Sequence, residues 1–386
     1  MTSRNRLQAQ LAFLDEVDRL KSVVRANQLV DRSRHENSAE HSWHLALYAL
    51  TFADTAPEAD VDRAILMLLL HDIVEIDAGD HPIHLDHDWE AVAAAEQRAA
   101  DRLFGLLPAD QGAYFRSVWT EFEQAQTPTA RYAKRLDTVQ PMLVTLLGDH
   151  PIPDHNDVVR FNLTQGRARH LADSWAPLYE LAVAHLEGAP HTPDSDLAQR
   201  LAFLTEACRL KSVNRASMLH DGSRRENSGE HSWHVALYAS TLAEHAHTPI
   251  LAHRPVQMLL IHDLVEIDVG DAPIHGNHDL DAIAAAEQSA AQRIFGLLPT
   301  HVGAALLDLW QEFEAATTDD AIFAKSVDRV QPLNGNLANG GGSWVEYNVT
   351  YDQLVARVGN KVARGAPAVW DEMNDRISRH PWFANS

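Results

Sequence analysis

The sequence predicts an all-α protein built from two tandem copies of one domain. Four segments near the start of the chain return in the same order about 190 residues later. Apolar residues recur every three or four positions from Leu7 through Val17 to Val24, which is the spacing of a helix face. Alternating Val, Ile or Thr runs bounded by turn pairs, which would indicate strands, are nearly absent. We therefore expect two helical domains of about six helices each.

The repeat sets the domain boundaries. Its length is far beyond the roughly 20–50 residues of a solenoid repeat, so the repeated unit is a whole domain. Residues 188–196 between the copies are rich in Gly, Pro and Asp, which is typical of a linker. We expect a first domain at 1–188, a linker at 189–196 and a second domain at 197–386. The matching segments are 13–23 with 203–213, 40–44 with 230–234, 71–77 with 262–268, and 104–108 with 295–299.

Composition narrows the function classes. The chain of 386 residues has 54 acidic and 32 basic side chains and a net charge of −22, so a nucleic-acid polymer or an anionic membrane is an improbable partner. Its one cysteine, Cys208, excludes an internal disulfide and any cysteine-cluster metal site. No apolar run approaches the roughly 20 residues that span a bilayer, and the N-terminus is polar. We expect a cytoplasmic protein.

The first candidate motif surrounds His41. Asn37 followed three residues later by Glu40 is the pattern of a helix capping box, which would put His41 near the start of a helix. His44 lies three residues further on the same face, where a core or surface role is the better reading.

The second motif joins an apolar helix to adjacent His71 and Asp72. Burying an ionisable pair is costly unless a group such as a metal ion compensates it. Glu75 follows within one helical turn, and Gly79 and the next proline suit a helix end. Asp80 would then lie on the loop just beyond, where it can reach a pocket.

The third motif is an aspartate followed four residues later by proline, at Asp137 with Pro141 and again at Asp328 with Pro332. Proline removes a helical hydrogen bond, so we expect a kink beside each aspartate. The kink would either serve packing or aim the aspartate.

Together the motifs give each copy two histidines and two aspartates in the same order. Imidazole and carboxylate ligands suit a divalent ion, one per domain, with Mn, Co, Fe, Ni, Zn and Mg as candidates. A water bound to such an ion becomes a nucleophile near neutral pH. The two predicted ligand sets are His41, His71, Asp72 and Asp137, and His231, His262, Asp263 and Asp328.

This ordered pattern resembles the HD-domain superfamily of metal-dependent phosphohydrolases, and within it the branch of 5′-deoxynucleotidases and related HD-domain proteins. The resemblance covers nearly the whole of each copy. It implies two tandem HD-domain helical bundles that release phosphate from nucleoside monophosphates or a similar small phosphate ester. It also implies that Glu75 and Asp80 are catalytic and that Arg25 binds phosphate, with Glu266, Asp271 and Arg215 as their counterparts.

The resemblance ends at a few positions. The branch carries an aromatic residue after its phosphate-binding arginine, whereas this chain has Ala26 and Ala216, so a preference for deoxyribose does not follow. After the last aspartate, the second copy has a glycine loop ending in Trp344 where the first copy has a proline-containing segment, so the two sites need not be equally active. His84 and His275 lie just past the loop aspartates, where they would line the pocket or lie on a surface loop.

Charge gives a further argument for a phosphate ester. Residues 19–34 hold five basic and one acidic residue, and residues 209–225 repeat these numbers. A basic stripe beside a metal site, in a strongly acidic chain, is what a phosphate ester needs. The alternative is a solvated helix face, above all for Lys21 and Arg34.

Two other functions stay open. One is a non-catalytic protein that binds or senses a nucleotide, although Glu75 and Glu266 would be superfluous in a pure binding site. The other is a di-iron oxygenase, which needs additional histidine ligands, and only His44 lies between His41 and His71.

Duplicated domains joined by a short linker often reproduce a homodimer within one chain, with a self-matching interface. Relatives of the branch form dimers, so we expect the halves to pack as an intramolecular pseudo-dimer related by a pseudo-twofold axis.

Overall fold

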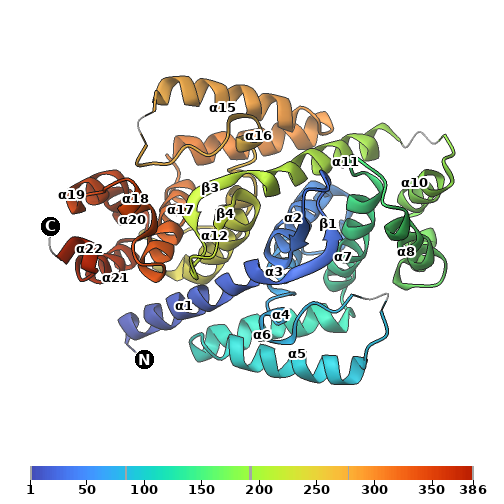
Figure 1. The fold of residues 1–386 in the computed structure, drawn as a ribbon, viewed down its shortest axis with the longest axis horizontal. Coiled ribbons are helices and arrows are strands. Elements are labelled where there is room, and N and C mark those ends of the chain that lie inside the picture. Colours follow the sequence, from blue (N-terminus) through green and yellow to red (C-terminus); the bar gives the residue numbers. More distant parts are fainter. Residues whose placement is uncertain (1, 83–84, 191–193, 277, 385–386) are drawn as a thin grey trace.

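The computed structural model describes residues 2–82, 85–190, 194–276 and 278–384. Within these residues the fold is almost entirely helical, as predicted, and the two copies pack side by side (Figure 1). The chain begins with a long helix, α1 (Ser3–Val17), which extends from the first copy to the C-terminal helices of the second. There Arg4 forms an ion pair with Glu372 of one of these helices, so the first helix of the chain contacts the second copy.

In the described residues the first copy has more α-helices than the six we expected, although two of them have only four residues. They are α1, α2 (Ser38–Thr51), α3 (Val61–Leu70), α4 (Glu75–Ala78), α5 (Trp89–Phe104), α6 (Ala109–Gln124), α7 (Pro128–Leu146), α8 (Pro153–Thr164), α9 (Leu171–Ser174) and α10 (Ala176–Glu187).

The second copy repeats this order as far as its long seventh helix, after which the copies diverge. Where the first copy continues with the twelve-residue α8, the second has a glycine loop and the five-residue α18. Its helices are α11 (Ser195–Ala207), α12 (Ser228–Leu242), α13 (His253–Ile261), α14 (Glu266–Val269), α15 (Leu280–Phe295), α16 (Thr300–Ala315), α17 (Asp319–Ala338), α18 (Gly342–Glu346), α19 (Tyr351–Leu354), α20 (Asn360–Gly365), α21 (Pro367–Ser378) and α22 (Pro381–Ala384).

The sequence missed two short strand pairs. In each copy a five-residue strand pairs antiparallel with a three-residue strand, as β1 (Val24–Gln28) with β2 (His35–Asn37) and β3 (Asn214–Met218) with β4 (Arg225–Asn227). The apolar period that suggested one helix through Val24 is interrupted, because α1 ends at Val17 and Val24 is 62% exposed on β1. Strands this short, without an apolar alternation, leave no signal in composition.

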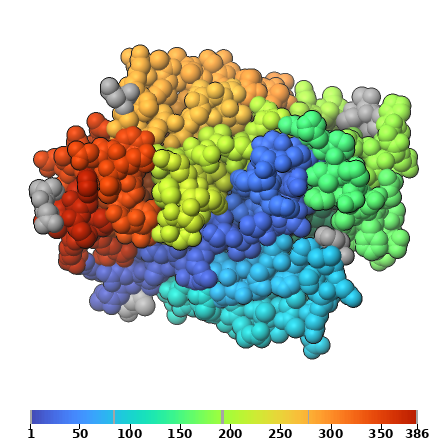
Figure 2. All heavy atoms as spheres, viewed as in Figure 1, coloured from blue at the N-terminus to red at the C-terminus, as the bar shows by residue number. Residues whose placement is uncertain are grey.

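The centre of the molecule is formed by α2 and α12, which pack against each other. Nearly every residue of both helices is buried, because small and apolar side chains surround the helix on all faces. The indole nitrogen of Trp43 donates to the carbonyl of Leu260 across the interface (2.9 Å), and Trp233 donates to Leu69 in the opposite direction (3.0 Å). The copies therefore form one continuous body (Figure 2).

Within the described residues, none of the helices is both long enough and apolar enough to cross a bilayer.

Candidate metal and phosphate site

Helix α2 begins as the sequence predicted. The Asn37 side chain accepts from the backbone N–H of Glu40 (3.0 Å), and the Glu40 carboxylate accepts from the backbone N–H of Asn37 (2.7 Å). This capping box fixes the start of the helix and puts His41 in its first turn, fully buried.

His71 and Asp72 lie where α3 ends in a turn that leads to α4. The Nδ1–H of His71 donates to the carbonyl of Leu68 (2.8 Å), which leaves Nε2 without its proton. This Nε2 atom is buried and has no hydrogen-bond partner among the described residues. It lies 3.0 Å from Asp72 Oδ1 and 3.8 Å from Asp137 Oδ1. Burial would raise the pKa of Asp72, but the neighbouring His71 and Arg25 side chains lower it to about 2.

His41 completes the group. Its Nε2 lies 3.4 Å from Asp137 Oδ1 and 3.9 Å from Asp72 Oδ2, while its Nδ1–H donates to Gln140 Oε1 (3.0 Å). One ligand atom each from His41, His71 and Asp137 lies within 4.8 Å of the others. An orphaned imidazole nitrogen beside converging carboxylate oxygens fits a divalent cation. The structure thus brings together all four predicted ligands of the first copy.

The second copy repeats this geometry. His262 Nδ1–H donates to Leu259 (2.9 Å), and its buried Nε2 again has no hydrogen-bond partner among the residues described. This Nε2 lies 3.1 Å from Asp263 Oδ1, and His231 Nε2 lies 3.2 Å from Asp328 Oδ1. The four predicted ligands of the second copy therefore also converge, and a backbone carbonyl again orients the histidine at the end of the apolar helix.

Helices α7 and α17 carry the last aspartates and continue through Pro141 and Pro332. The carbonyl of Pro141 accepts from the side chain of Asn27 on β1 (3.0 Å), which links this part of α7 to the strand that bears Arg25. The bend that we expected beside each aspartate stays a prediction.

Arg25 is the cationic partner of the site. Its Nη1 lies 2.7 Å from Asp72 Oδ2, 3.6 Å from Glu75 Oε1 and 3.8 Å from Asp80 Oδ1. Glu75 also accepts a hydrogen bond from Ser38 Oγ. Burial and the Asp72 carboxylate raise the pKa of Glu75 well above its usual value. The structure therefore gathers the predicted catalytic and phosphate-binding residues around the ligand carboxylates.

The equivalent arginine of the second copy has the same neighbours. Arg215 Nη1 lies 2.5 Å from Asp263, 3.5 Å from Glu266 and 3.9 Å from Asp271. Ser228 Oγ donates to Glu266, as Ser38 does in the first copy.

A cavity of about 410 Å³ opens over the first group. Ala26, next to Arg25, lies in its wall, at the position where the branch that this sequence resembles has an aromatic residue. Helices α5, α6, α7 and α8 provide most of the other walls. The predicted site residues that line it are Arg25, His71, Asp72, Glu75, Asp80 and Asp137.

The basic stripes predicted from composition do not form. Among the basic residues of 19–34, Arg25 alone lines the cavity. Arg34 pairs with Glu40, and the guanidinium of Arg32 donates to backbone carbonyls, including that of Thr145. Charge along a sequence does not reveal whether a cation is consumed by a buried pair, so the composition overestimated the free positive charge.

A crossing lysine is the main feature that sequence reasoning missed. Glu36 is fully buried and accepts from Gln140 Nε2 (3.2 Å), the same side chain that holds His41. Its other partner is Lys211 of the second copy, whose ammonium donates to Glu36 Oε1 and lies 3.1 Å from His44 Nδ1. The buried glutamate beside each site is thus paired with a lysine of the other copy, since Lys21 makes the equivalent contact with Glu226 (2.7 Å). The repeated Arg-Leu-Lys-Ser-Val segment contains both lysines, but the sequence does not show that each one reaches into the opposite copy.

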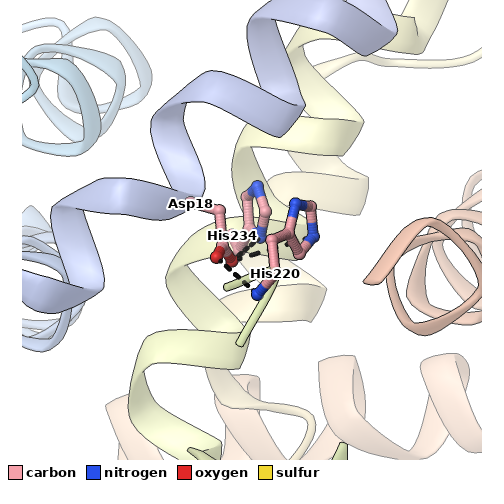
Figure 3. Close-up of side chains that lie close together, drawn as sticks. All are labelled: Asp18, His220 and His234. Carbon is pink, nitrogen blue, oxygen red and sulfur yellow. Dashed lines mark hydrogen bonds and ion pairs between the residues drawn. The ribbon is translucent and has the colours of Figure 1, made fainter. Parts of the chain in front are cut away.

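The surroundings of Lys21 differ from those of Lys211. Beside Lys21, the side chains of Asp18, His220 and His234 gather within metal-ligand distance of one another (Figure 3). The Lys21 ammonium donates to Asp18 and lies 2.9 Å from His234 Nδ1, so the lysine itself supplies the cation there. Although burial opposes its charge, the carboxylates of Asp18 and Glu226 raise the pKa of Lys21.

Beside Lys211, His44 replaces His234, but the other two equivalent positions hold apolar side chains. Cys208 stands where the other half has Asp18, and it packs with Val30, which stands where the other half has His220. The interface is thus reciprocal in its lysines but not in their surroundings.

The other histidines that the sequence analysis considered have different places in the structure. His44 is a buried core residue, one of the two roles that the sequence favoured, and its Nε2–H donates to the carbonyl of Leu204 (2.9 Å). His275 lines a smaller cavity in the second copy. His84 lies outside the described residues.

The chain is similar in sequence to several known proteins. The human 5′-deoxynucleotidase HDDC2 is 28% identical over 134 residues, which cover 34% of this chain and 64% of the relative. The chain thus spans just under two thirds of the length of that protein. The fission yeast 5′-deoxynucleotidase hdd1 is 24% identical over 169 residues, which cover 42% of this chain and 84% of that protein.

Among solved structures, a protein from Magnetospirillum magnetotacticum described as a predicted metal-dependent phosphohydrolase is 40% identical, with a TM-score of 0.47. The match covers 50% of this chain and 98% of that one. The family model described as the HD domain matches twice, at residues 17–178 and 207–370. These two matches take in both ligand groups and most of the chain, which therefore belongs to the HD-domain family.

Proposed function

We propose that the first copy is a metal-dependent phosphomonoesterase that releases phosphate from nucleoside monophosphates or a similar small phosphate ester. The observation that carries this proposal is the placement of Arg25 within 2.7 Å of Asp72, at the base of a cavity of about 410 Å³ and beside the orphaned Nε2 of His71. A cavity of this size lies within the range of roughly 300–1,000 Å³ that is typical for small organic ligands.

The residues divide into three roles. His41, His71, Asp72 and Asp137 would hold one divalent ion, which when bound would polarise a phosphate oxygen and acidify a water molecule. Arg25 would bind the phosphate, because the planar guanidinium offers two parallel donors to it.

Glu75 would exchange a proton with the water or the leaving group, and Asp80 would assist beside the phosphate. Both carboxylates lie within 4 Å of Arg25, so a phosphate held by this arginine would be within their reach.

The names of the relatives support the substrate class, since both are called 5′-deoxynucleotidases. Ala26 gives no ring for the sugar to stack on, so we propose that ribonucleotides and deoxyribonucleotides are both accepted. A test of the function therefore needs both ribonucleoside and deoxyribonucleoside monophosphates.

We further propose that the two halves, bounded as 1–188 and 197–386, form an intramolecular pseudo-dimer about a pseudo-twofold axis. The reciprocal contacts support it, because Trp43 and Trp233, like Lys211 and Lys21, each reach into the opposite copy. The second ligand set, His231, His262, Asp263 and Asp328, would hold a second ion, with Glu266, Asp271 and Arg215 around it.

Phosphate release from a panel of nucleoside monophosphates, with Mn²⁺ or Co²⁺ added, tests the function. We expect turnover by the wild type and a loss of about 10²–10⁴-fold in Glu75→Gln, since that is the usual contribution of a general acid or base. Glu58→Gln, an exposed carboxylate changed in the same way, should leave turnover as it is.

The outcomes separate the candidate functions. If no nucleotide releases phosphate although metal is bound, the phosphatase proposal is wrong. Nucleotide binding without turnover in the wild type would favour the sensing alternative. The di-iron alternative has no support among the described residues, because His44 is committed to Leu204, Gln140 and Lys211.

A further inference from the structure

The two copies have very different space above their ligand groups. The cavity of the first copy has a volume of about 410 Å³, whereas the one that Arg215 and Asp328 line in the second has about 90 Å³. Organic ligands usually occupy pockets of roughly 300–1,000 Å³, so the second cavity is too small for a nucleoside.

One cause is a substitution next to the last proposed ligand. Thr138 follows Asp137 in the first copy, and its hydroxyl turns back to donate to the carbonyl of Lys134 (2.9 Å). The second copy has Arg329 after Asp328, and its Nε lies 3.6 Å from Asp328 Oδ2. A long cationic side chain therefore takes space that a threonine leaves open.

The second cause is the divergent segment after α17. In the first copy α8 provides the wall through residues such as Val158 and Asn162. In the second copy the short α18 brings in Ser343 and Trp344, and the Trp344 side chain is completely buried. The glycine loop that precedes α18 permits this close approach, since Gly340 and Gly341 both have positive φ values (78° and 110°).

Unpaired nitrogen atoms gather around the small cavity. The donors Arg215 Nε, Arg329 Nε and Trp344 Nε1, together with the ring atom Nδ1 of His275, are buried without a hydrogen-bond partner among the described residues, and all four residues line this cavity. In the first cavity, His71 Nε2 is the one such atom among the described lining residues. Buried polar atoms are normally paired, so a cluster of unpaired donors indicates a missing acceptor.

Charge points the same way. The described lining of the first cavity has six carboxylates and three lysines or arginines, whereas that of the second has two carboxylates and two arginines. The second cavity is therefore the better environment for a small anion, while the first depends more on a bound cation.

We propose that the second copy binds a tetrahedral oxyanion of the size of inorganic phosphate and excludes nucleotides, so that nucleotide turnover is confined to the first copy. This inference rests on the proposed function for its nucleotide half. Its anion half stands on the second cavity alone.

Calorimetric titration of the whole chain at saturating Mn²⁺ tests both halves. The probes are inorganic phosphate and a slowly hydrolysed nucleoside 5′-phosphorothioate. We expect two phosphates but one nucleotide analogue per chain. Two analogues per chain would overturn the exclusion.

A reciprocal exchange of the two differing residues gives matched variants. Thr138→Arg should close the first cavity to nucleotides, abolish nucleotide binding and lower turnover by at least about 100-fold, while at least one phosphate per chain still binds. Arg329→Thr should weaken phosphate binding in the second copy. Combined with Trp344→Ala, it should admit a second nucleotide analogue.

The outcomes distinguish this inference from the proposed function. If phosphate no longer binds to the Thr138→Arg protein, the second copy is not an anion site, whatever the turnover of the wild type. If phosphate binds there but the wild type neither binds nor hydrolyses nucleotides, the proposed function fails and the anion site stands. Should the Trp344→Ala protein fail to fold, Arg329→Thr alone decides the matter, because the Arg329 side chain is 29% exposed and its replacement leaves the core intact.

Discussion

The proposed metal histidines of one site are oriented by different kinds of partner. His71 is held by a backbone carbonyl of its own helix, which no substitution of a side chain can remove. His41 is held by Gln140, whose amide also donates to Glu36. A ligand held through a chain of side chains is sensitive to each of them.

We predict that Gln140→Leu weakens metal binding at the first site by about 10–100-fold, because His41 loses the acceptor that fixes its tautomer. Titration with Co²⁺, followed by its visible absorption, would measure this. Gln331→Leu should have the same effect on the second site and spare the first. Two binding constants within about twofold of the wild-type values would contradict this orienting role.

The residues of the site could be predicted because their chemistry conflicts with their surroundings. His71 and Asp72 follow an apolar helix, and Asp80 follows a helix-ending glycine, so the sequence pattern alone indicates each as a candidate site residue. The roles of Lys21 and Arg34 could not be predicted, because the sequence does not show whether a basic side chain faces a ligand or a buried carboxylate. Their partners, Glu226 and Glu40, emerge only from the packing.

At the scale of elements, the repeat and the helical period predicted the fold class, whereas the short strands escaped notice. Pairing of β1 with β2 depends on the turn between them, in which Arg32 has a positive φ value of 60°. The guanidinium of Arg32 caps carbonyls at the end of α7, and this holds the turn in place. Such a turn is stabilised by contacts distant in sequence, so local patterns do not reveal it.

The approach of α6 to the end of α5 gives a prediction at this scale. A Cβ atom on Gly112 would lie 2.3 Å from the carbonyl oxygen of Phe104, a backbone atom that cannot move alone. Gly112→Ala should therefore lower the free energy of unfolding by about 1–3 kcal/mol, as overpacking usually does.

Denaturant unfolding would measure that loss. Gly303→Ala in α16 should match it, since its Cβ would lie 2.3 Å from the carbonyl oxygen of Phe295. Ser117→Ala, at an exposed position of α6, should change little. Equal stability of Gly112→Ala and Ser117→Ala would show that the helices separate without cost.

At the scale of the whole molecule, the interface is held by buried polar groups that must keep their charge states. His44 and His234 are both fully buried beside a lysine, and burial together with that lysine lowers the pKa of each imidazole well below its usual value. Both stay neutral in the folded protein, but in the unfolded chain they take up a proton below about pH 6.5.

Acid should therefore destabilise the protein through these two histidines. Below about pH 6.5 the unfolded state binds more protons than the folded state. The free energy of unfolding therefore keeps its full value above this pH. At lower pH it falls by up to about 1.4 kcal/mol per pH unit for each histidine. Unfolding curves between pH 7.5 and 5 would measure the slope. It should be smaller in His44→Gln and His234→Gln than in the wild type, and unchanged in His150→Gln, an exposed histidine. An identical slope in all four proteins would exclude the interface as the source.

The surroundings of the two crossing lysines also determine which halves can recognise each other. Two first copies brought together in the observed way would bury Asp18 against Val30, and two second copies would place His220 against Cys208. Only the mixed pair places both His220 and His234 beside Asp18 (Figure 3) and packs Cys208 against Val30. Mutual selection between the copies would thus favour the pairing of a first copy with a second copy over the pairing of two like copies, so the duplicated halves are complementary partners that cannot replace each other.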